Sequence, residues 1–168
     1  VPEELKEQWR RELSERFNLA DLIDRELLIC SHSESESLFS ETQPSMLVVD
    51  EVHQIAPWGW KVDGPEKRAF TSIAEAAKKA EICLILSGTP LFGNELNYLA
   101  ILHLLSPDIY QLDEQGRNEF TAKIEKRELV GGIYQSFTEQ NDNATLSEAL
   151  DKLRSFFPED KELQLLIE

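Results

Sequence analysis

Apolar residues recur with two different periods along the chain, and the period predicts the type of element. From residue 3 to residue 17 an apolar side chain stands at every fourth position among charged residues, which predicts an amphipathic helix started by Pro2. Three short apolar runs follow, each typical of a strand buried on both faces of a parallel sheet. These runs are residues 27–30, 46–49 and 82–86.

A helix is predicted at residues 66–80, between the last two runs, so the order of elements indicates an α/β fold with a parallel sheet. After residue 94 the pattern becomes helical and acidic, and Asn94 is expected to cap a helix that Ser106-Pro107 ends. We therefore divide the chain into an α/β part, residues 1–110, and an acidic α-helical extension or spacer, residues 111–168.

Turn residues predict how this extension is interrupted. A helix from Arg117 to Leu129 should end at Gly131-Gly132, and Thr145 with Glu148 should form a capping box for the next helix. A last short amphipathic piece is expected at residues 161–167. Two polar segments, residues 33–45 and 138–144, are predicted to be loops.

Composition narrows the class of protein. No apolar run approaches the roughly 20 residues that cross a bilayer, and the acidic start is unlike a signal peptide, so we expect a cytoplasmic protein without a membrane partner. Cys30 and Cys83 lie in apolar runs and the three histidines are scattered, which predicts neither disulfides nor a zinc site. A net charge of -15 argues against strong nucleic-acid binding by this segment alone, although a local contact strip stays open.

Two adjacent carboxylates, Asp50 and Glu51, directly follow the second apolar run. Ligands bind outside the carboxyl ends of strands in open α/β sheets, so both acids should emerge where a nucleotide would lie. Phosphoryl transfer to water needs a metal and an oriented water, which two carboxylates could supply between them. A solvated turn is the plain alternative for such a pair taken alone.

The end of a second predicted strand weakens the interpretation of Asp50 and Glu51 as a solvated turn. The run at 82–86 leads into Ser87-Gly88-Thr89-Pro90, and neighbouring parallel strands would bring Ser87 and Thr89 beside Glu51 and His53. The hydrogen bonds of these hydroxyls could then change with the state of the bound nucleotide.

Asp50-Glu51-Val52-His53 resembles helicase motif II of the DExH class in superfamily two, which contains the Walker B acids. Ser87-Gly88-Thr89-Pro90-Leu91, with Asn94-Glu95-Leu96 and Leu104-Leu105-Ser106-Pro107 after it, is similar to motif III of Swi/Snf-type ATPases and its downstream helix. The segments around Gln8-Trp9 and Leu28-Ile29-Cys30-Ser31 resemble motifs Ia and Ib. Order and spacing agree over residues 1 to about 110, and Leu105 to Tyr110 followed by acidic helices resembles the bacterial RapA/HepA-like branch.

The resemblance implies a partial first RecA-like domain of an ATP-dependent translocase on duplex DNA. Asp50 would hold Mg²⁺ through water, Glu51 would be the catalytic base, and His53 would couple hydrolysis to Ser87, Gly88 and Thr89 of motif III. Gln8 and Ser31 would face the nucleic acid, unless Gln8 is merely an exposed helix residue and Ser31 a strand-end cap. ATP, Mg²⁺, DNA, the second RecA-like domain, and RNA polymerase or another protein complex are the cofactors and partners expected of the intact protein.

The chain departs from the family in lacking any Gly-Lys-Ser or Gly-Lys-Thr, so the phosphate-binding P-loop is absent. Gly59-Trp60-Lys61 has neither the spacing nor the hydroxyl of that loop, which we expect upstream of Val1. This segment alone should neither bind ATP tightly nor hydrolyse it. Trp58 and Trp60 could stack on bases, but packing against the following helix is the favoured interpretation.

Two other functions fit the same sequence. One is an RNA or DNA helicase of the wider DExH class, which a strand-separation assay would distinguish from a translocase. The other is a non-catalytic scaffold that has lost its P-loop. Codons upstream of Val1 would separate enzyme from scaffold, since a Gly-Lys-Thr loop there supports the enzyme and a start codon at Val1 the scaffold.

Overall fold

The computed structural model describes residues 1–88, 94–136, 143–158, 160–161 and 165. Their contacts form two compact units, residues 1–117 and 118–168, called here the N-terminal and C-terminal units. The elements are α1 (Lys6–Glu15), α2 (Ser35–Glu41), β1 (Met46–Val49), α3 (Pro65–Lys79), β2 (Ile82–Ile85), α4 (Glu95–Leu105), α5 (Glu114–Ser136) and α6 (Asn143–Phe156). Four short 3₁₀ turns lie at Glu3–Leu5, His32–Glu34, Val52–Gln54 and Ala56–Trp60. The predicted mixture of helices with a parallel sheet is thus present, mostly as helix.

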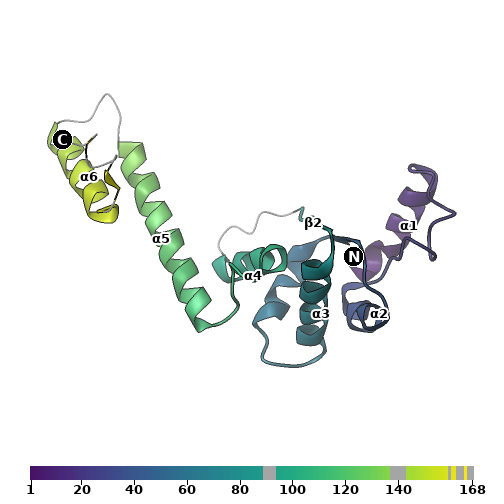
Figure 1. Ribbon diagram of the computed structural model, residues 1–168. Coiled ribbons are helices and arrows are strands. Elements are labelled where there is room, and N and C mark those ends of the chain that lie inside the picture. The colour runs from purple at the N-terminus through teal and green to yellow at the C-terminus, as the bar shows by residue number, and fades with distance from the viewer. Residues whose placement is uncertain (89–93, 137–142, 159, 162–164, 166–168) are drawn as a thin grey trace. The chain divides into compact units, whose positions relative to one another are not determined.

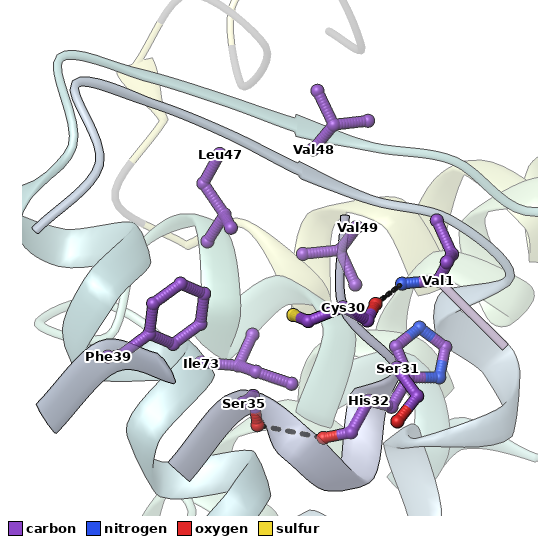
Figure 2. Close-up of a pocket in the computed structure, with 10 residues that line it drawn as sticks. All are labelled: Val1, Cys30, Ser31, His32, Ser35, Phe39, Leu47, Val48, Val49 and Ile73. Carbon is purple, nitrogen blue, oxygen red and sulfur yellow. Dashed lines mark hydrogen bonds between the residues drawn. The ribbon is translucent and has the colours of Figure 1, made fainter. Parts of the chain in front are cut away.

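The sheet consists of β1 and β2, which pair in parallel with Met46 opposite Ile82 and Val49 opposite Ile85. The predicted order of strand, helix and strand is therefore confirmed. Figure 2 shows Leu47 and Val49 pointing to one side of the sheet, toward Phe39 and Ile73, and Val48 to the other. The second face is open, since Met46, Ile82 and Leu84 are 51%, 56% and 44% exposed. The expectation of strands buried on both faces is wrong for this chain, because the described elements cover only one face.

The core of the N-terminal unit forms around α3. Its buried stripe includes Ala69, Phe70, Ile73 and Ala77, and Ile73 lies three or four residues from each of the others, as on one face of a helix. This helix contacts α2 on one side and α4 on the other (Figure 1). The packing of α3 with α2 and α4 forms the helical layer on which β1 lies.

Two predictions in residues 27–45 are wrong. Residues 28–30 form no strand and Leu27 makes only an isolated bridge with Ile23, because no strand among the described residues lies beside this run to complete a ladder. Residues 33–45 are largely helical, as the 3₁₀ turn and α2 fill most of that range. A capping box starts this helical segment: the Ser31 N–H donates to the Glu34 carboxylate, and the Ser31 side chain accepts from the Glu34 N–H.

The predicted cap of α4 is confirmed, since the Asn94 side chain accepts a hydrogen bond from the Asn97 N–H at 3.1 Å. In the C-terminal unit the predicted break is wrong, because α5 continues through Gly131 and Gly132 to Ser136. Glycine in a helix costs only about 1 kcal/mol relative to alanine, so two glycines do not by themselves end it.

The predicted capping box for α6 is also misplaced. This helix begins at Asn143, so Thr145 lies inside it. Most of the predicted loop at 138–144 and of the predicted helix at 161–167 lies outside the described residues. No helix within the described part of the chain is long and apolar enough to cross a membrane.

Candidate functional site

The ends of β1 and β2 stay joined beyond the strands themselves. The Leu86 N–H donates to the Val49 carbonyl at 2.9 Å, and the Val52 N–H donates to the Leu86 carbonyl at 3.0 Å. These two bonds bracket Asp50 and Glu51, so the backbone of both residues lies beside the turn that follows β2.

Glu51, His53, Ser87 and Gly88 form a cluster at this edge, as the sequence predicts. Glu51 Oε2 lies 3.0 Å from His53 Nδ1 and accepts a hydrogen bond of 3.3 Å from the Gly88 N–H. Ser87 Oγ lies 3.3 Å from the same His53 nitrogen. Thr89, the third predicted member of the motif, lies outside the described residues.

The backbone of Glu51 is in the left-handed region, with φ 50° and ψ 44°. Asn18 and Asp24 also have positive φ, but short polar side chains tolerate that region better than glutamate does. Backbone strain of this kind costs about 1–3 kcal/mol and concentrates at functional sites. The left-handed conformation of Glu51 turns the chain sharply after β1 and directs the Glu51 side chain toward Gly88.

Asp50 is held by donors from three segments. Its Oδ2 accepts a hydrogen bond of 2.7 Å from the Trp9 indole N–H, and its Oδ1 accepts one of 2.9 Å from the Glu51 N–H. Its carbonyl accepts a third, of 2.8 Å, from His32 Nε2. Neither Trp9 nor His32 is predicted from the sequence to be part of the site, because no local spacing connects them with Asp50.

His32 is only 6% exposed, and burial lowers its pKa to about 4. The ring is therefore neutral near pH 7. Because the Asp50 carbonyl only accepts, the single ring proton lies on Nε2. The ring also meets Trp58 edge to face, with centroids 6.3 Å apart.

The side chains at this edge suit a magnesium ion held largely by water and phosphate. Carboxylate and hydroxyl oxygens are hard donors, and Mg²⁺ in proteins takes one or two carboxylates and keeps several waters. Within the described ranges no three His, Cys, Asp or Glu side chains form a group that could hold a metal on their own. The donor set therefore fits Mg²⁺ bound through water at Asp50, and it does not fit a cage made by protein alone.

A small pocket lies under β1, on the covered face of the sheet (Figure 2). It is lined by apolar side chains such as Phe39, Leu47 and Ile73, and its volume is about 30 Å³. That is room for water and far too little for a nucleotide.

The remaining predicted residues lie in different surroundings. Gln8 is exposed on α1, whereas Ser31 is 2% exposed and belongs to the capping box. Trp58 and Trp60 pack against the core, and the Trp60 indole N–H donates to the Leu96 carbonyl at 2.7 Å. These contacts support packing as the role of the two tryptophans.

Comparison with known proteins finds distant similarity to RNA polymerase-associated protein RapA from several bacteria. The identity is 29% over 143 residues with the protein of Yersinia pseudotuberculosis, covering 71% of this chain and 14% of that protein. It is 26% over 162 residues for Vibrio campbellii, with 82% and 16% covered, and 29% over 178 aligned positions for Cronobacter sakazakii, with 89% and 18% covered.

No family model matches the chain, and no solved structure matches it either. The chain spans less than a fifth of the length of these relatives. The similarity to RapA nevertheless agrees with the RapA/HepA-like branch that the motifs resemble.

Proposed function

We propose that this chain is part of the first RecA-like domain of a Swi/Snf-type, RapA-like ATPase that translocates on duplex DNA. The observation that carries the proposal is the contact of Glu51 with Gly88 where two parallel strands end, with Asp50 directly before Glu51 in the chain. This is the edge at which α/β sheets bind nucleotides. Similarity to RapA over 71% or more of the chain supports the same conclusion.

Each side chain at the edge has one proposed task. Asp50 holds Mg²⁺ through its water shell, and the ion when bound neutralises charge on the β- and γ-phosphate oxygens of ATP. Glu51 orients the attacking water and takes its proton. His53, which lies close to both Glu51 and Ser87, couples hydrolysis to the turn of Ser87 to Thr89. The same tasks require a P-loop and a second RecA-like domain from outside this chain.

The charge of the chain bears on its partners. A net charge of -15 repels DNA phosphates, so the basic surface of the intact protein must come mainly from other segments. Gln8, exposed on α1, is the better placed of the two proposed nucleic-acid contacts, since Ser31 is buried. The relatives are named as RNA polymerase-associated, and we extend that partner and a cytoplasmic location to the intact protein as part of the proposal.

The test is ATP turnover by the intact protein with Glu51→Gln. The amide keeps the size of the side chain but takes no proton, so turnover should fall about 10²- to 10⁴-fold while nucleotide binding persists. Glu75→Gln, at an exposed position of α3, is the matched control and should leave turnover unchanged. Normal turnover in Glu51→Gln would remove that residue from its proposed role.

Two further measurements separate the alternatives. Duplex DNA should stimulate turnover without strand separation, whereas unwinding would favour a DExH-class helicase. An intact wild-type protein that neither binds nor hydrolyses ATP would favour the scaffold. The isolated 168-residue chain should show no turnover with Mg²⁺ and ATP.

A further inference from the structure

The side-chain hydrogen bond from Trp9 to Asp50 joins residues 41 positions apart in the sequence. It is short, at 2.7 Å, and it ends on a carboxylate oxygen. Hydrogen bonds to an ionised acceptor are roughly twice as strong as those between neutral groups. This contact therefore attaches α1 firmly to the end of β1.

The two oxygens of Asp50 accept from different donors. Oδ2 accepts from the indole, and Oδ1 accepts from the Glu51 N–H. Two bonds in different directions fix both the rotamer and the plane of the carboxylate. A carboxylate has about four lone-pair sites, so acceptor capacity remains for the water shell of an ion.

We propose that Trp9 is a positioning residue for the magnesium site, an inference that rests on the proposed function of Asp50. The indole N–H fixes the Asp50 carboxylate, while His32 fixes the backbone carbonyl of the same residue. Groups that hold a metal-binding carboxylate in this way typically change metal affinity or activity about 10- to 100-fold when they are removed.

The Trp60 indole makes a purely structural hydrogen bond in the same chain. Its N–H also donates at 2.7 Å, but to the Leu96 carbonyl on α4 rather than to a carboxylate. Both rings are partly buried. Trp60→Phe is therefore a matched control for Trp9→Phe, because each substitution keeps an aromatic ring and removes one indole donor.

The first readout needs no activity. The chain has three tryptophans, so the ¹⁵N-labelled 168-residue protein should give three indole N–H signals in NMR, and Trp9→Phe identifies that of Trp9. Asp50→Asn removes the charge of the acceptor, which should shift the Trp9 signal and leave those of Trp58 and Trp60 in place. Unmoved signals for all three tryptophans would overturn the proposal.

The second readout is the magnesium dependence of ATP turnover by the intact protein. Trp9→Phe should raise the half-saturating Mg²⁺ concentration about 10-fold, with near-normal turnover at saturating Mg²⁺. Trp60→Phe should keep the wild-type dependence. Wild-type turnover with the same Mg²⁺ dependence in both variants would overturn the role of Trp9 alone, whereas a wild-type protein without turnover would overturn the proposed function and this role with it.

Discussion

The two units of the chain differ in the range of the ion pairs and side-chain hydrogen bonds that the structure gives for them. In the N-terminal unit, segments far apart in sequence meet, as where Trp9 and His32 both bond to Asp50 across 41 and 18 positions. In the C-terminal unit the ion pairs given by the structure are local, as between Glu148 and Lys152 one helical turn apart. The described bonds of the first unit therefore bring side chains from three segments together at the candidate site.

Glycine substitutions should expose this difference most strongly. A Cβ added at Gly59 would lie 2.9 Å from Phe70 Cζ and 3.1 Å from Leu112 Cδ1, in the core of the N-terminal unit. Gly59→Ala should lower the free energy of unfolding by about 1–3 kcal/mol, because a packed core yields little. All three tryptophans lie in this unit, so urea unfolding followed by tryptophan fluorescence measures it.

The paired substitution in the C-terminal unit is Gly131→Ala. A Cβ there meets nothing within 4 Å, and the position is inside α5. Alanine should therefore raise helix stability by about 0.5–1 kcal/mol, seen as a later loss of the far-ultraviolet circular dichroism signal. Destabilisation by both substitutions would show that α5 is held by tertiary contacts like those around Gly59.

Sequence patterns predicted the elements whose apolar period is complete within the element. The strand pair, α3 and the cap of α4 were predicted because branched apolar runs, a helical stripe and Asn94 each carry their own signal. The strand predicted at residues 27–30 is not formed, since a strand needs a partner strand that its own residues do not specify. The helical segment after Ser31 was missed because its capping box begins in a serine- and glutamate-rich stretch that also suits a loop.

The candidate site also contains residues that the sequence predicts to lie together and residues that it does not. Asp50, Glu51, His53 and Ser87 could be expected together because strand ends in a parallel sheet meet at one edge. The sequence does not predict that Trp9 and His32 contact Asp50, because these contacts depend on where α1 and the 3₁₀ turn at His32–Glu34 pack. The spacing of apolar residues does not specify that packing.

A smaller effect is expected from the strained backbone of the N-terminal unit. Glu51 has φ 50°, a conformation that costs residues with a Cβ roughly 1–2 kcal/mol and glycine almost nothing. Glu51→Gly should therefore be about 1 kcal/mol more stable than Glu51→Ala, the reverse of the order in a helix such as α5. Urea unfolding of the two variants measures the difference, and a more stable alanine variant would show that Glu51 is not strained in solution.

The smallest effect concerns two glutamates that pair over different ranges. The bond with Lys6, 28 positions away, and the Ser31 N–H lower the pKa of Glu34 from 4.5 to about 2, whereas Lys152 lowers the pKa of Glu148 across one helical turn. A lowered folded-state pKa adds stability above the unfolded value, and this is lost as the pH falls from about 4.5 toward 2. Glu34→Gln should therefore lower the fluorescence-detected urea midpoint more at pH 6 than at pH 3, where part of the contribution is lost, and by a modest amount because the side chain is half exposed. Glu148→Gln should leave that midpoint unchanged at both values, and a Glu34→Gln effect of equal size at pH 6 and pH 3 would show that the carboxylate charge contributes nothing.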